Sequence, residues 1–113
     1  MADVIAYKIL TTMQFSELQR EEVFRGSPAD RADGYIHLST APQLSGTLEK
    51  HYAGQTGLFI ATVDLACLAE ILRWEPSRGG QLFPHLYGPL PIAAIIATTE
   101  VERLADGTLK LPG

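Results

Sequence analysis

The sequence has one cysteine and no long apolar run, and both absences exclude whole classes of protein. A single cysteine, Cys67, excludes an intramolecular disulfide framework and every zinc site built from several cysteines. No stretch of about 18 apolar residues is present, so the sequence predicts no membrane-spanning helix. The apolar neighbours of Cys67 indicate a small core residue rather than a reactive thiolate.

Basic charge is scarce as well. Nine Lys and Arg stand against thirteen Asp and Glu, which gives a net charge of −4 and a pI near 5.2. An acidic chain is a poor candidate for coating nucleic acid or an anionic membrane, although a local basic pocket is compatible with it. The first four residues carry an acid where a secretory signal carries base. We therefore expect a cytoplasmic protein with no membrane contact and no extended nucleic-acid surface.

Familiar nucleotide-binding and hydrolase motifs are also missing. The sequence contains no GxxxxGK[ST], no GxGxxG and no GxSxG, which argues against P-loop, Rossmann and α/β-hydrolase proteins. Asp33, His37 and His85 do not have the compact spacing of metal ligands, so no metal site is predicted.

What remains is an ordinary globular composition. A length of 113 residues, with 46% hydrophobic and 19% charged residues, predicts a single domain over residues 1–113 with a real core. Strand patterns outnumber helical ones, which favours an α+β fold with small mixed or antiparallel sheets and two or three short helices. Strands are predicted at 4–10, 35–39, 58–63, 70–75 and 92–98, shorter extended pieces at 23–24 and 109–111, helices at 13–19 and 42–52, a helical turn at 64–68, and a turn at 27–34.

Polar residues that a fold does not otherwise require gather first in the segment 35–40. Strand alternation places Tyr35, His37 and Ser39 on one face. A histidine and a serine two positions apart can jointly hold one ligand. The competing interpretation is a half-exposed strand face on which His37 bonds a backbone carbonyl.

The second concentration is the segment 83–90, FPHLYGPL. Its two prolines and one glycine predict a stiff, sharply shaped loop that displays His85 and Tyr87. Stiff loops suit binding sites because little order is lost when a ligand is captured. The alternative is a turn that covers the edge of a sheet with Phe83 and Tyr87.

Two charged positions complete the set of candidates. Glu75 ends a predicted strand beside a tryptophan, which predicts a carboxylate with a raised pKa, fit for acid–base or cation-stabilising work. The alternative is a surface salt bridge with Arg73 or Arg78. Lys8 interrupts the apolar strand 4–10, so it either reaches a sheet edge or holds an anion.

Four segments together resemble one bacterial family, the domain of unknown function numbered 952. They are YKIL from Tyr7, DGYIHLST from Asp33, RWE from Arg73 and FPHLYGPL from Phe83, and the likeness covers nearly the whole chain. That family is in turn similar to the ADP-ribosyltransferase-like superfold, especially the RNA 2′-phosphotransferases. The resemblance implies two small, strongly bent sheets with a dinucleotide in the cleft between them.

The resemblance also implies roles for individual residues. His37 and Ser39 match the NAD-contacting His-Leu-Ser strand, and Tyr7 with Lys8 matches the motif of the first strand. The phosphotransferases have histidine, glycine and threonine where this chain has Lys8, Ile9 and Leu10. A different nucleotide or anionic ligand is therefore also compatible with the pattern.

The first functional hypothesis is a transferase or glycohydrolase that acts on NAD, or a related ribosyl nucleotide, as substrate. Glu75 would stabilise oxocarbenium character at the ribose, and His37 with Ser39 would orient that sugar. His85 would serve as the acid–base group, because an imidazole exchanges protons near neutral pH. The remaining candidates would bind the ligand through stacking, packing or phosphate contacts: Tyr7, Lys8, Tyr35, Arg78, Phe83 and Tyr87.

Two alternatives stay open. A non-catalytic module would bind a nucleotide or small anion in the same cleft, and a structural or partner-binding protein would use the histidine segments only as turn and edge devices. The sequence requires no particular cofactor and does not indicate an oligomeric state.

Overall fold

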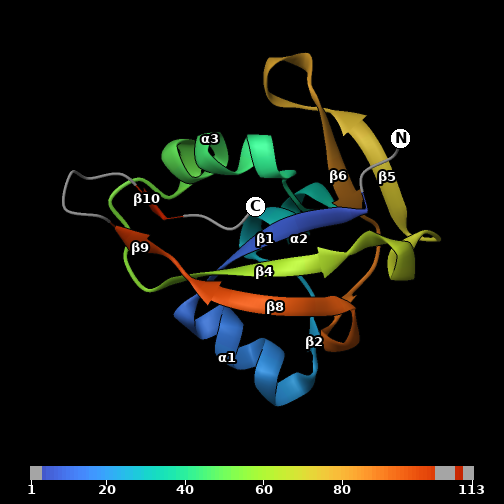
Figure 1. Ribbon diagram of the computed structural model, residues 1–113. Coiled ribbons are helices and arrows are strands. Elements are labelled where there is room, and N and C mark those ends of the chain that lie inside the picture. The colour runs from blue at the N-terminus through green and yellow to red at the C-terminus, as the bar shows by residue number, and fades with distance from the viewer. Residues whose placement is uncertain (1–3, 104–108, 111–113) are drawn as a thin grey trace.

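Two three-stranded antiparallel sheets form the framework of the protein (Figure 1). This computed structural model describes residues 4–103 and 109–110. The first sheet has the order β1–β4–β8, and the second has the order β3–β6–β5. The strands are β1 (Ile5–Thr11), β3 (Ile36–His37), β4 (Leu58–Asp64), β5 (Leu72–Pro76), β6 (Leu82–Leu86) and β8 (Ile95–Glu100).

Short helices and two small ribbons complete the described chain. The fold is thus the predicted α+β class with antiparallel sheets and three short α-helices among the described residues. None of these helices is long and apolar enough to cross a membrane. The remaining elements are α1 (Thr12–Glu21), α2 (Pro28–Asp33), α3 (Ala41–His51), the 3₁₀ turns η1 (Leu65–Leu68), η2 (Arg78–Gly80) and η3 (Ile92–Ala94), and the pairs β2 (Val23–Phe24) with β7 (Leu90–Pro91) and β9 (Glu102–Arg103) with β10 (Leu109–Lys110).

The two sheets are joined where β1 meets the end of β3. The Tyr7 amide donates to the Ser39 carbonyl at 2.8 Å, and the Ser39 amide donates to the Tyr7 carbonyl at 2.9 Å. This antiparallel bridge brings the first-strand residues Tyr7 and Lys8 beside His37 and Ser39. Segments about thirty positions apart in the sequence therefore become neighbours.

Within the segment 27–34, Pro28–Asp33 forms the helix α2, which corrects the prediction of a turn. Ser27 caps α2 by accepting from the Asp30 amide at 3.1 Å, and the Asp30 carboxylate accepts from the Ser27 amide at 2.9 Å. Pro28 opens the first turn, and Gly34 closes the helix with a left-handed φ of +88°. The same cap, proline, aspartate and glycine that indicate a turn also satisfy both ends of a helix of six residues.

Two further expectations need correction. The strand predicted at 92–98 begins later, because Ile92–Ala94 forms the turn η3 before β8 starts at Ile95. Cys67 is exposed rather than a core residue, since the turn η1 directs its thiol toward Asp64, whose carboxylate lies 3.3 Å from the sulfur. That hydrogen bond, followed by the charge of Asp64, raises the pKa of the Cys67 thiol. The expectation that Cys67 is not a reactive thiolate agrees with this shift.

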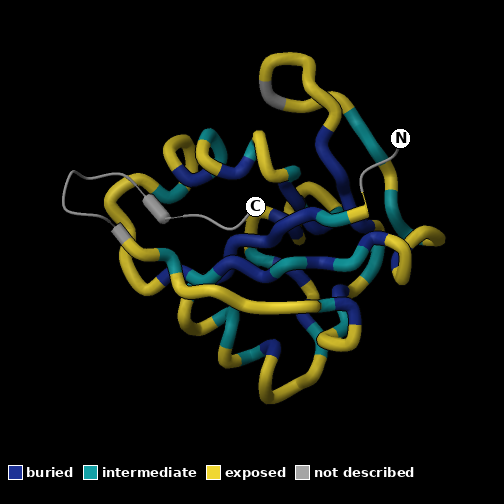
Figure 2. The backbone as a smooth tube through the Cα atoms, viewed as in Figure 1, coloured by how far each residue is buried: buried dark blue, intermediate teal, exposed yellow. Residues whose placement is uncertain are grey.

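The core lies on both faces of the first sheet, and β1 and β4 are its most buried strands (Figure 2). Burial on both faces explains why these strands read as nearly continuous apolar runs. The edge strand β8 is exposed over most of its length. The larger cluster includes Leu10, Leu18, Phe24, Leu38, Leu86 and Leu90; the smaller one consists of Tyr7, Ile9, Leu44, Leu48, Leu58 and Ile60.

The smaller cluster predicts the stability cost of loosening α3. Leu44 is fully buried against β1 and β4, so Leu44→Ala is expected to lower the free energy of unfolding by about 2–5 kcal/mol. Urea denaturation measures this loss. The matched control is Met13→Ala on the exposed side of α1, where the side chain is 84% exposed and the expected change stays within about 0.5 kcal/mol. Equal effects for the two variants would contradict this description of the core.

Candidate functional site

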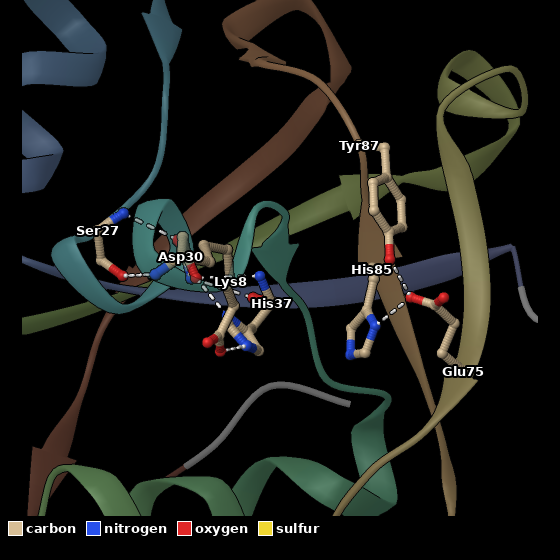
Figure 3. A network of polar contacts seen from close by, with 8 residues as sticks. Lys8, Ser27, Asp30, His37, Glu75, His85 and Tyr87 are labelled. Carbon is tan, nitrogen blue, oxygen red and sulfur yellow. Dashed lines mark hydrogen bonds and ion pairs between the residues drawn. The ribbon is translucent and has the colours of Figure 1, made fainter.

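The Asp30 carboxylate is the centre of a polar network that joins α2 to both sheets (Figure 3). Its Oδ2 accepts from the Ser27 amide and from Lys8 Nζ, each at 2.9 Å. Its Oδ1 accepts from the His37 amide at 3.1 Å and from His37 Nδ1 at 2.6 Å. Lys8 Nζ also donates to the His37 carbonyl at 3.0 Å. The site thus rests on a carboxylate whose two oxygens each accept two hydrogen bonds.

Burial and charge act in opposite directions on this network. Burial alone would raise the pKa of Asp30, but the hydrogen bond from His37 and the charge of Lys8 outweigh it and hold that pKa well below its usual range. Burial lowers the pKa of Lys8, and Asp30 partly offsets that effect. The two side chains are 4% and 2% exposed. An isolated buried charge is strongly disfavoured, so the charge of each residue offsets the free-energy cost of burying the other.

His37 lies between two carboxylates contributed by α2. Its Nδ1 contacts Asp30 Oδ1, and its Nε2 lies 2.9 Å from Asp33 Oδ2. A carboxylate can only accept, so both contacts are hydrogen bonds when the imidazole carries a proton on each nitrogen. In that state Lys8 and His37 balance the charges of Asp30 and Asp33, and the network as a whole is neutral.

His85 is the cross-strand partner of His37 in the second sheet. The ring is 2% exposed, and its Nδ1 lies 2.8 Å from Glu75 Oε1. The same oxygen accepts from the Tyr87 hydroxyl at 2.7 Å (Figure 3). Glu75 reaches His85 diagonally, because β5 pairs with β6 in a register that places Arg73, and not Glu75, directly opposite the histidine.

The pKa of Glu75 is lowered, which corrects the expectation of a raised one. The hydrogen bond from His85 is the largest cause, and the hydrogen bond from Tyr87 is the next. Arg73, one of the two arginines named in the alternative interpretation, donates instead to the backbone carbonyls of Leu72 and Glu70. Glu75 is therefore an ionised carboxylate that accepts a hydrogen bond from the protonated Nδ1 of His85.

Tyr35 covers the two histidines from the same face of the sheet. Its ring stacks on His85 with 4.0 Å between centroids and lies 4.7 Å from His37 and 5.3 Å from Tyr87. Burial, followed by the charges of Asp33 and Glu75, raises the pKa of its hydroxyl. The prediction that Tyr35 and His37 share a strand face matches this arrangement, and β6 adds His85 and Tyr87 to it.

A cavity of about 380 Å³ opens between the two sheets, α2 and α3. Both histidines and the Lys8–Asp30 pair contribute to its wall. Among the described residues, His85 Nε2 has no hydrogen-bond partner. Every described side-chain nitrogen or oxygen atom that is fully buried does have a partner. Nε2 is therefore not fully buried, and it is accessible. The cavity is lined by Tyr7, Lys8, Ile9, Ser27, Pro28, Ala29, Asp30, Asp33, His37, Leu38, Ser39, Thr47, His51, Tyr52, Ser77, Phe83 and His85.

Most of the predicted site residues meet here, and the others divide into three cases. Glu75 contacts the site through His85 and is not among the residues that line the cavity. Tyr35 and Tyr87 line a neighbouring groove. The side chain of Arg78 lies outside the described residues. The predicted candidates that line the cavity itself are Tyr7, Lys8, His37, Ser39, Phe83 and His85.

Sequence reasoning missed Asp30 and three residues of α3 and its end. Asp30 was detectable, because Ser27 followed three positions later by an acid is a capping signature that fixes the carboxylate near the helix start. Thr47, His51 and Tyr52 line the cavity through α3, and no local pattern marks them. In the part of the chain that the structure describes, no group of three or more His, Cys, Asp or Glu side chains is arranged to hold a metal ion.

The fold and the site define a class: small α+β proteins in which two antiparallel sheets border a cavity lined by two cross-strand histidines of one sheet, each paired with a carboxylate. The chain belongs to the family described as Protein of unknown function (DUF952), which matches residues 9–98. This confirms the resemblance to the family of unknown function. No curated protein matches the sequence.

Solved structures of one relative share the whole fold. The crystal structure of protein CC0527 from Caulobacter crescentus is 39% identical, with a TM-score of 0.87, and the match covers 94% of this chain and 93% of that one. The solution NMR structure of CC0527 is 40% identical, with a TM-score of 0.80, over 91% of this chain and 89% of that one. The arrangement of sheets and helices described above is therefore that of a known family structure.

The buried charge pair predicts a specific loss of stability. Asp30→Asn leaves Lys8 buried without a counter-charge, so the free energy of unfolding is expected to fall by about 3–5 kcal/mol at neutral pH. Asp33→Asn, one turn along α2 and 53% exposed, is the matched control and is expected to cost less than about 1 kcal/mol. Chemical denaturation of both variants measures the difference. Equal losses would contradict a structural role centred on Asp30.

The same pair predicts the direction of acid sensitivity. The pKa of Asp30 is lower in the folded protein than in the unfolded chain, so its stabilisation is fully present above the unfolded value of about 3.9. It is lost as the pH falls below that value toward the folded pKa. Denaturation curves at a series of acidic pH values should show a shallower decline for Asp30→Asn than for the wild type. A decline of the same slope would show that other carboxyls dominate acid unfolding.

Proposed function

We propose that this protein is a transferase or glycohydrolase that binds a ribosyl nucleotide such as NAD in the cavity, with His85 as its acid–base group. The observation that carries the proposal is the geometry of His85. Its Nδ1 is held by the ionised Glu75 at 2.8 Å, and the ring lines the cavity. A carboxylate at one ring nitrogen fixes the tautomer and directs the other nitrogen to the reacting atom.

Glu75 supports this chemistry as a positioning residue. It does not line the cavity, so direct stabilisation of an oxocarbenium ion at the ribose requires a ligand that reaches past His85. The hydrogen bond to Nδ1 instead keeps a proton on that nitrogen and leaves Nε2 as the basic atom. When Nε2 takes up a proton, the negative charge of Glu75 stabilises the imidazolium that forms. Tyr87 holds Glu75 in place from the other side.

The cavity wall favours the uncharged part of a nucleotide. Its volume of about 380 Å³ falls within the roughly 300–1,000 Å³ of small-molecule sites. Tyr7, Tyr52 and Phe83 supply aromatic surface for a base, and Ser39 supplies a hydroxyl for a ribose. The positive charge of Lys8 is paired with Asp30, so the wall offers hydrogen bonds rather than an unpaired positive charge. Lys8 keeps one N–H beyond its two described contacts.

The ADP-ribosyltransferase-like resemblance supports the choice of ligand. It assigns His37 and Ser39 to the ribose-contacting strand, and both residues line the cavity. It also assigns a cleft between two small sheets as the site of the dinucleotide, and the cavity opens between two such sheets. NAD or a related ribosyl nucleotide is therefore the first ligand class to test.

A non-catalytic nucleotide- or anion-binding module is the second candidate. The observation that favours it is the depth of His85, whose ring is 2% exposed and stacked by Tyr35. A ring held this closely is well suited to fixed recognition of a ligand. The two candidates differ in turnover and agree in binding, so binding and turnover are measured separately.

Binding is tested by a thermal-shift screen with NAD, ADP-ribose, nicotinamide and simple nucleotides. A ligand at a hundred times its Kd is expected to stabilise the fold by about 2.7 kcal/mol, which is a shift of several degrees for a domain of this size. His37→Ala should remove that shift, since the imidazole is part of the cavity wall. The control Lys50→Ala removes an exposed side chain near the end of α3 that does not line the cavity, and it should retain the shift. No shift with any ribosyl nucleotide would overturn the proposed ligand class.

Turnover is tested by nicotinamide release from NAD with Glu75→Gln. This change keeps an acceptor for His85 Nδ1 and removes the negative charge, so the rate is expected to fall by about a hundredfold or more. Nucleotide binding should persist, because Glu75 does not line the cavity. Glu70→Gln, at an exposed position before β5, is the control and should leave the rate unchanged. Saturable binding without any product would leave the binding module as the function.

A further inference from the structure

A second concave surface adjoins the cavity across the stacked rings of Tyr35 and His85. It is a groove of about 440 Å³. Tyr35 lines the groove and His85 lines the cavity, and their centroids are 4.0 Å apart. The groove is lined by Arg25, Asp30, Arg31, Gly34, Tyr35, Ile36, Leu86, Tyr87, Gly88 and Pro89.

The two arginines that line the groove are only weakly paired with acidic side chains. Arg31 has no ion pair or side-chain hydrogen bond within the described residues. Arg25 has one ion pair, with Glu21 at 3.3 Å, and both members are largely exposed, so this pair holds the guanidinium only weakly. The acid in the lining, Asp30, is already occupied by Lys8, Ser27 and His37. Two guanidinium groups therefore remain available to a ligand.

Local backbone geometry holds the stem of Arg31 near the groove. Gly26 adopts a φ of +117°, and a Cβ there would lie 3.0 Å from the Asp30 Cβ and 3.6 Å from the Arg31 Cγ. The absence of a side chain lets the first turn of α2 pack closely against the segment that carries Arg25. The side chains of Arg25 and Arg31 therefore both line the groove, Arg25 from the segment before the Ser27 cap and Arg31 from α2.

Tyr87 links the groove to the acid–base pair. Its ring is 45% exposed and forms part of the groove, while its hydroxyl donates to Glu75 at 2.7 Å. A planar ligand that packs on this ring would lie one hydrogen bond from Glu75 and two from His85. The groove is therefore placed to hold a second molecule close to the chemistry proposed for the cavity.

We propose that the groove binds the oxyanion, a phosphate or carboxylate, of a small aromatic acceptor substrate, with Arg31 and Arg25 as its ligands and Tyr87 as its packing surface. Guanidinium groups bind both oxyanions through paired N–H donors, which makes them the suitable residue type at such a site. The role as acceptor rests on the transferase activity proposed above. Binding of an oxyanion at this place does not depend on that activity.

The experiment titrates the full chain, labelled with ¹⁵N, with phenyl phosphate and with benzoate and follows amide shifts. Both compounds are expected to shift the amides of Gly34, Tyr35, Tyr87 and Gly88 in a saturable way. Benzyl alcohol, which keeps the ring and lacks the charge, should shift them little. The ratio of the two affinities shows which oxyanion the groove prefers.

Two variants test whether Arg31 itself binds the oxyanion. Arg31→Gln should weaken phenyl phosphate about tenfold, as expected for the loss of one charge-assisted hydrogen bond. Arg20→Gln, on α1 and 68% exposed, removes the same charge at a position that does not line the groove and should change the affinity less than twofold. A similar loss in both variants would show general charge attraction and overturn the site.

Other outcomes separate this inference from the proposed function. Absence of groove shifts at millimolar phenyl phosphate, or equal binding of benzyl alcohol, would overturn the oxyanion site. A thermal shift with NAD would then still support the cavity. Groove binding without any nucleotide binding would retain the oxyanion site and remove its role as the acceptor subsite.

Discussion

The ion pair between Lys8 and Asp30 is the interaction on which the rest of the site depends. It joins the strand β1 to the helix α2, and both side chains are almost fully buried. The Asp30 carboxylate has no further capacity, because its oxygens already accept from Ser27, Lys8 and twice from His37. One residue therefore caps a helix, neutralises a buried lysine and orients a cavity histidine. A polar network of this kind is stabilising only when every member is satisfied, which ties the shape of the cavity to the integrity of the pair.

The sequence predicted the strand framework and six of the residues that line the cavity, and the reasons are local. Tyr35 and His37 lie together because alternate residues of an extended segment point to the same side. Ser39 follows β3 and pairs with Tyr7 of β1, and it lines the cavity with His37. The segment around His85 was recognisable from its prolines and aromatic residues. What was not predictable is register. Glu75 meets His85 because β5 and β6 pair with a particular offset, and a shift by one residue would have turned its side chain to the opposite face.

Asp30 and Cys67 show the limits of composition in a different way. The segment around Asp30 contains residues common to turns and to helix ends, and only the completed capping pair decides between them. Cys67 has apolar neighbours in the sequence, yet the tight turn η1 places it at the surface. The pKa of Glu75 was misjudged because desolvation by the neighbouring tryptophan was expected to dominate. The hydrogen bonds from His85 and Tyr87 have the larger effect.

The bridge between Tyr7 and Ser39 lies in the wall of the cavity. Two opposed backbone hydrogen bonds join the two sheets there, and the walls of the cavity extend from this bridge along both sheets. His37 lies close to this point, whereas the β5–β6 hairpin that carries Glu75 and Ser77 extends away from it (Figure 1). A molecule that contacts both walls would therefore add contacts between the two sheets to those that the bridge already makes.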